Sequence, residues 1–69
     1  TVNFVVQING KKREILDIVK NLSENEVLEI INNNEKLFKY IKDQKILKKI
    51  FVQNKIINLI VKWKYIDWF

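Results

Sequence analysis

The pair Asn9-Gly10 is the feature that most restricts how this chain can fold. It stands between two runs rich in β-branched residues, and a tight hairpin turn needs positive φ, which glycine adopts without a clash from a Cβ atom. Residues 2–8 place apolar side chains at every second position, as a half-buried strand does. We therefore expect a hairpin that the rest of the chain covers or extends into a larger sheet.

The register of this hairpin decides where its charged residues point. A three-residue loop with Gly10 in the left-handed region would put Gln7 beside Lys11. In that register Lys11 and Arg13 lie on one face of the sheet, and the opposite face of the second arm carries the apolar Leu16 and Ile18 toward the core. Three cations follow the turn directly, which raises the question of a polyanionic partner.

Residues 22–27 predict the start of a helix. Ser23 is a typical N-cap, Glu26 stands three residues later as in a capping box, and Leu22 and Val27 form a hydrophobic staple. Such a cap stabilises a helix by about 1 kcal/mol. The buried stripe of this helix is expected at Val27, Leu28, Ile30 and Ile31.

Three asparagines, residues 32–34, end the first helix, and Asn34 is suited to cap a short second one. The expected apolar side of this second helix carries Leu37, Phe38 and Ile41, and its other side carries Lys36, Lys39 and Lys42.

From Lys45 onward the pattern is that of a second hairpin, with strands over 46–52 and 55–61 and with Asn54 at a positive-φ position. The predicted class is α+β: a two-layer β-β-α-α-β-β domain with a four-stranded sheet of two hairpins covered by helices on one face. We expect a single domain over residues 1–69, with its core over about 2–61. The aromatic tail over 62–69 could prolong the last strand, pack under the helices or meet a partner.

The composition argues against catalysis by this chain alone. It contains no histidine and no cysteine, so neither a nucleophile–base pair nor an acid–base pair tuned near neutrality is evident, and no metal-binding motif is present. The absence of cysteine fits a reducing compartment. Without a signal pattern or an apolar run long enough for a membrane span, we expect a cytoplasmic fragment of a longer protein.

Charge is unevenly distributed along the chain. Residues 1–35 carry four cations and six anions, whereas residues 36–69 carry nine cations and two anions. This asymmetry is typical of proteins that bind nucleic acid, although an AT-rich genome would also enrich lysine together with isoleucine and asparagine. Lysines on the two hairpins could bind phosphates, and Arg13 could grip one with two parallel hydrogen bonds. Asn9 and Asn54 are expected to be turn residues, and Asn58 a sheet polar group or a backbone anchor.

Three motifs in one order resemble the C-terminal domain of bacterial-type leucyl-tRNA synthetase. They are Val5-Val6-Gln7-Ile8-Asn9-Gly10-Lys11 with Arg13, Ser23-Glu24-Asn25-Glu26-Val27, and the run from Ile46 to Val61. The resemblance covers about residues 4–61. Matching positions include Gln7, Asn9, Gly10, Lys11, Arg13, Lys48, Val52, Asn54, Lys55 and Asn58. Gln53 departs from the family, which usually has proline there, and the tail lies beyond the resemblance.

The resemblance implies a small, mobile, non-catalytic domain that touches the elbow of tRNA-Leu and so supports aminoacylation and editing. It would work in cis with the rest of a leucine–tRNA ligase, whose catalytic domain uses ATP, and would itself need no cofactor and be monomeric. The positions carried over as tRNA backbone contacts are Lys11, Arg13, Lys48 and Lys55.

Two other functions remain open from the sequence. A glycine-containing hairpin followed by a helix and strands also suits a ubiquitin-like protein-interaction module, which would expose an apolar patch including Trp63 or Trp68. The basic segment over 36–42 could instead lie on an anionic lipid surface.

Overall fold

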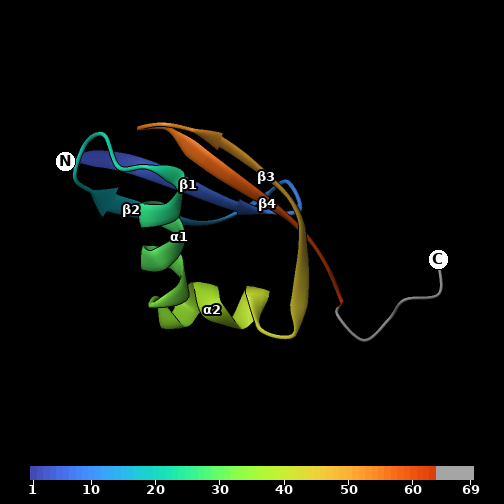
Figure 1. The fold of residues 1–69 in the computed structure, drawn as a ribbon. Helices are drawn as coiled ribbons and strands as arrows, with labels where there is room; N and C mark the ends of the chain where they lie inside the picture. Colours follow the sequence, from blue (N-terminus) through green and yellow to red (C-terminus); the bar gives the residue numbers. More distant parts are fainter. Residues whose placement is uncertain (64–69) are drawn as a thin grey trace.

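The computed structural model describes residues 1–63 and contains four strands and two helices (Figure 1). In chain order these are β1 (Val2–Ile8), β2 (Lys11–Ile18), α1 (Glu24–Asn32), α2 (Glu35–Ile41), β3 (Gln44–Val52) and β4 (Ile56–Trp63). The predicted α+β class and element order are confirmed. The last strand runs two residues further than the sequence pattern indicated, to Trp63. The tail residues Tyr65, Trp68 and Phe69 lie outside the described residues, and so do their predicted roles in packing under the helices or meeting a partner.

The sheet has the strand order β2-β1-β4-β3. Each hairpin is antiparallel, and the two hairpins join through β1 and β4, which run parallel with Val5 opposite Ile56 and Ile8 opposite Leu59. Both helices lie on the same side of this mixed sheet (Figure 1). We call the uncovered side the open face.

The core lies between the sheet and the helices. Its buried side chains are Phe4, Val6 and Ile8 of β1, Ile18 of β2, Val27 and Ile31 of α1, Leu37 of α2, and Ile57, Leu59 and Val61 of β4. Burying a side chain of this size contributes about 1.5–3 kcal/mol. The two central strands supply most of the core, and β3 supplies no fully buried side chain. The edge position of β3 accounts for this difference.

The helices begin where the sequence indicated. The Ser23 hydroxyl accepts a hydrogen bond from the Glu26 N–H at 3.2 Å, and Glu26 Oε1 accepts one from the Ser23 N–H at 3.0 Å, so the capping box is complete. Asn34 caps α2 by accepting from the Leu37 N–H at 3.1 Å. One expectation for α2 is wrong: Phe38 is 44% exposed, and Tyr40 packs against the core together with Ile41 instead. A seven-residue helix buries only a narrow stripe, and Phe38 lies outside it.

The first hairpin differs from its predicted form in the length of its turn. Only Asn9 and Gly10 separate the strands, both with positive φ (52° and 81°) as in a type I′ turn, and Ile8 pairs with Lys11. Gln7 therefore pairs with Lys12 rather than Lys11. A β-bulge follows, because Val6 pairs with Glu14 and leaves Arg13 as the extra residue of β2. The bulge restores the predicted faces for the rest of the strand but not the predicted register: Phe4 lies opposite Leu16 and Val2 opposite Ile18, two residues further along β2 than a three-residue loop would place them.

The second hairpin has the longer loop. Residues 53–55 connect β3 to β4, Asn54 has the predicted positive φ (67°), and the Lys55 N–H donates to the Val52 carbonyl at 3.0 Å. β3 also contains a bulge at Leu47, because Ile46 pairs with Val61 and Lys48 with Ile60.

Candidate nucleic-acid interface

Asparagine side chains hold the first turn against the last strand. Asn9 Oδ1 accepts a hydrogen bond from the Val61 N–H at 2.8 Å, and the Asn9 N–H donates to the Leu59 carbonyl at 2.9 Å. Asn58 Oδ1 accepts from the Gly10 N–H at 3.0 Å. Of the two roles left open for Asn58, that of a backbone anchor is confirmed. The cationic turn is thereby fixed on β4 and does not project freely.

A second group of asparagines fixes the opposite end of the sheet. Asn54 Oδ1 accepts from the Asn21 N–H at 2.7 Å, and Asn54 Nδ2 donates to Asn21 Oδ1 at 3.0 Å. Gln53 Nε2 donates to the Leu22 carbonyl at 3.4 Å. Gln53, which stands where the resembled family usually has proline, therefore contributes a weak link between the second hairpin and the start of α1.

The four predicted RNA-binding residues are all exposed, but the structure does not bring them together. Lys11 and Arg13 lie beside the first turn, whereas Lys55 immediately precedes β4, and its carbonyl accepts a hydrogen bond from the Val5 N–H. At ~3.3 Å per residue, the four residues from Val5 to Asn9 separate these two ends by about 13 Å. Lys48 of β3 pairs with Ile60 of β4 and lies on the open face.

The expectation that Lys11 and Arg13 share the face opposite the helices is wrong. Lys11 pairs with Ile8, whose side chain is in the core, so its register position is on the helix side. The Arg13 guanidinium lies over the ring of Tyr40 in α2, with Cζ 4.8 Å from the ring centroid. The two-residue turn reverses the alternation that a three-residue loop would have produced, and the bulge turns Arg13 toward α2.

Lys12 takes the open-face position that was assigned to its neighbours, because it pairs with Gln7. Strand pairing puts Lys45, Lys48 and Lys62 on the same face, all toward the end of the sheet that carries the first turn. Lys49 pairs with Leu59 and so takes the helix side. The other half of the open face is apolar, with Val5, Ile15, Val52 and Ile56 in one row across the four strands.

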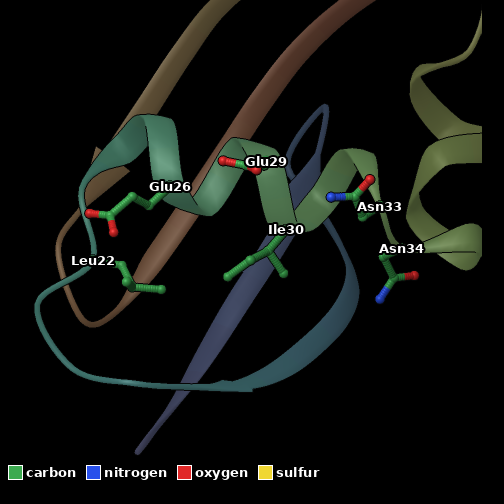
Figure 2. Close-up of a pocket in the computed structure, with 6 residues that line it drawn as sticks. All are labelled: Leu22, Glu26, Glu29, Ile30, Asn33 and Asn34. Atoms are coloured by element: carbon green, nitrogen blue, oxygen red, sulfur yellow. The ribbon is translucent and has the colours of Figure 1, made fainter.

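A groove of about 530 Å³ lies along α1, lined by Leu22, Glu26, Glu29, Ile30, Asn33 and Asn34 (Figure 2). Figure 2 shows Leu22 and Ile30 on one side of the helix, with Glu26 and Glu29 along it. The Ser23 N–H, and then the Ser23 hydroxyl, hold the pKa of Glu26 below its ordinary value. Ionised carboxylates repel phosphate, so this groove is not a candidate site for RNA.

The described part of the chain offers no assembled metal centre. Within residues 1–63, no group of three or more histidine, cysteine, aspartate or glutamate side chains comes together in a way that could hold a metal ion. No helix in the same residues is long and apolar enough to cross a membrane.

Several known proteins similar to this chain are leucine–tRNA ligases. The chain is 45% identical over 62 residues to a leucine–tRNA ligase of Malacoplasma penetrans, which covers 90% of the chain and 8% of the relative. It is 46% identical over 58 residues to a leucine–tRNA ligase of Buchnera aphidicola, covering 84% of the chain and 7% of the relative. The chain is homologous to a segment of leucine–tRNA ligase. It spans about 8% of the length of these relatives, and no protein-family model matches it.

A solved structure of a leucyl-tRNA synthetase has the same fold in the homologous segment. The leucyl-tRNA synthetase AgnB2 of Agrobacterium radiobacter K84, crystallised as a ternary complex with tRNA and LeuAMS, matches with a TM-score of 0.82 and 30% sequence identity. The match covers 93% of this chain and 8% of the synthetase chain. The resemblance found in the three sequence motifs therefore extends to the arrangement of strands and helices.

The sequence could not predict which face of the sheet each charged residue of the first hairpin takes, because that depends on the turn and on the bulge at Arg13. The motif residues Asn9, Gly10, Asn54 and Asn58 act in the fold, as turn residues or backbone anchors. Sequence reasoning missed the pairing of Arg13 with Tyr40, because no local pattern links β2 to α2. A lone arginine beside a hairpin turn was the one available signal.

Proposed function

We propose that this chain is a non-catalytic, tRNA-binding appendage of a cytoplasmic leucine–tRNA ligase. The observation that carries the proposal is the match to a synthetase crystallised with tRNA, in both sequence and fold. The ATP-dependent ligation of leucine would belong to other domains of the parent protein. The appendage would contribute binding energy for tRNA-Leu and so support aminoacylation and editing.

The charge distribution fits a phosphate-binding surface. Lysines 12, 45, 48 and 62 share one half of the open face, and Lys11 and Arg13 extend this positive end toward the helices. Lysine and arginine neutralise backbone phosphates without reading base sequence, which suits recognition of a folded RNA by its shape. We propose that Lys11, Arg13 and Lys48 contact the tRNA elbow and that Lys55 contacts a separate phosphate.

Titration of labelled tRNA-Leu with the 69-residue chain, at about 50 and about 200 mM salt, tests the proposal. We expect weak binding that falls steeply with salt, since each neutralised phosphate releases counterions. A microhelix, which contains the acceptor stem and lacks the D and T arms, is the matched control. It should bind more weakly, because it has no elbow. Absence of salt-sensitive binding at high protein concentration would contradict the proposal.

A protein-interaction function has one supporting observation. Trp63, which takes the helix side of β4 with Leu59 and Val61, is 43% exposed. On the open face, Ile15, Ile50 and Val52 are each more than two-fifths exposed. A partner protein docked on this surface would bind with little dependence on salt, which separates the two functions in the same titration.

A further inference from the structure

Two cations converge on one aromatic ring beside the first turn. The Arg13 Cζ lies 4.8 Å from the centroid of the Tyr40 ring, and the Lys39 Nζ lies 5.4 Å from the same centroid. The two side chains come from elements distant in the sequence, the bulge of β2 and the second half of α2. The electron-rich ring attracts each cation, so both stay beside the same side chain.

Among residues 1–63, neither Arg13 nor Lys39 forms an ion pair. The acidic neighbour of Arg13 is Glu14, whose Oε1 accepts a hydrogen bond from the Ile15 N–H at 3.2 Å. Two like charges beside one ring repel each other, and an anion bound next to them would offset that repulsion. The cluster is thus complementary to a negatively charged ligand.

The geometry also prepares Arg13 for a particular kind of anion. As the extra residue of the bulge, Arg13 is turned out of the strand alternation and toward α2, where contact with Tyr40 limits its rotation. A guanidinium can form two parallel hydrogen bonds with two oxygens of a phosphate, and holding it in place lowers the entropy cost of binding.

We propose that Arg13, Lys39 and Tyr40 form a binding site for one backbone phosphate of RNA, on the helix side of the first turn. The proposal rests on the tRNA-binding function above and adds α2 to the RNA-contacting surface. Arg13 binds the phosphate, Lys39 adds a second charge, and the Tyr40 ring positions both. Lys11, which also takes the helix side, extends the positive potential around the site.

The test measures the affinity of the 69-residue chain for tRNA-Leu over a range of salt concentrations. Arg13→Ala and Lys39→Ala should each weaken binding, Arg13→Ala about tenfold at low salt. Each should also reduce the slope of log affinity against log salt by about 0.7–0.9, the loss of one phosphate contact. Arg13→Lys should keep the salt slope but lower the affinity, because lysine keeps the charge and cannot form two parallel hydrogen bonds with the phosphate. Lys20→Ala, two residues beyond the far end of β2, is the charge-matched control and should change neither quantity.

Tyr40 tests whether positioning matters. Tyr40→Leu keeps apolar bulk in the half-buried site and should weaken binding in the unaltered background but not in the Arg13→Ala background. Tyr40→Phe keeps the ring and should bind as the unaltered chain does. Thermal unfolding of each variant shows that it is folded before binding is compared.

The contrary results are distinct. Salt-dependent tRNA binding that is unchanged by Arg13→Ala and Lys39→Ala would overturn the phosphate site and leave the tRNA-binding function standing. Equal losses from Tyr40→Leu with and without Arg13 would overturn the positioning role. Absence of salt-dependent binding by the unaltered chain would overturn both the site and the function on which it rests.

Discussion

Asn58 and Gly10, 48 residues apart, are joined by a hydrogen bond of 3.0 Å from the Gly10 N–H to Asn58 Oδ1. The bond crosses from β4 to the first turn and supplies a partner for a backbone donor that the two-residue turn leaves unpaired in the ladder. Asn58→Ala removes that partner. We expect the free energy of unfolding to fall by about 1 kcal/mol, measured by urea denaturation. Asn3→Ala, an exposed asparagine of β1, should be nearly neutral, and an equal loss in both variants would contradict the anchoring role.

Gly10 has a φ of 81°, and a Cβ atom added to it would meet nothing within 4 Å. The cost of Gly10→Ala therefore comes from the backbone alone, and we expect about 1 kcal/mol of destabilisation. Asparagine tolerates the left-handed region better, so Gly10→Asn should lose less. Thermal unfolding of the two variants should rank them in that order. The reverse order would show that the turn does not retain its positive φ.

Ile57 and Ile50 provide a matched pair on neighbouring strands. Ile57 of β4 is fully buried, whereas Ile50 of β3 is 44% exposed. Ile57→Val should reduce the free energy of unfolding by about 0.5–1.5 kcal/mol through the loss of one buried methylene and the small cavity left behind. Ile50→Val should change it by less than about 0.5 kcal/mol. A large effect at Ile50 would indicate that the open face is covered in solution.

Glu26 gives the capping box of α1 a dependence on pH. Hydrogen bonds from the Ser23 N–H and then the Ser23 hydroxyl lower the pKa of Glu26 from its ordinary value of 4.5. Because the pKa is lower in the folded state, the stabilisation is fully present above 4.5 and is lost as the pH falls through the folded value. Unfolding of the unaltered chain and of Glu26→Gln, compared at about pH 7 and about pH 3, isolates this contribution from the other carboxylates. The difference between the two proteins should shrink at the lower pH. A constant difference would contradict the assignment.

Lys48 of β3 pairs with Ile60 of β4, which is five positions beyond Lys55, or about 16 Å along the strand. At that distance their effects on tRNA binding should add. We expect Lys48→Ala and Lys55→Ala each to reduce the salt slope by about 0.7–0.9, and the double variant by the sum. The matched comparison is the Arg13 and Tyr40 pair, for which the effects should not add. Coupling between Lys48 and Lys55 would mean that they bind the same phosphate.

Local sequence patterns were sufficient to predict the helices and strands, but not the type of turn that sets the positions of the charged residues. Ser23 with Glu26, and Asn34, mark the helix starts because the hydrogen bonds of a cap lie within three residues. Both a type I′ turn and a three-residue loop accept glycine at a positive-φ position. The type I′ turn also needs positive φ at Asn9, and asparagine tolerates that conformation. The sequence therefore could not distinguish the two, and the faces of Lys11 and Lys12 were exchanged.

Long-range pairing accounts for the remaining gaps. The prediction of Leu16 and Ile18 on the core side was correct because the bulge at Arg13 compensates for the shorter turn. The parallel pairing of β1 with β4 and the contact of Arg13 with Tyr40 depend on how distant segments meet. Alternation within a strand carries no information about its neighbours in the sheet.

The parallel pairing of β1 with β4 also has a consequence for synthesis of the protein. During translation the strand that emerges first must wait for the one that emerges last, because Val5 and Ile8 find their central partners only at Ile56 and Leu59. Until residues near 59 have left the ribosome, the edge of β1 that faces β4 stays unpaired. Such non-local closure slows folding and exposes the nascent chain to aggregation. In the order of translation, the segment that completes the core is the last strand, which also anchors the cationic turn.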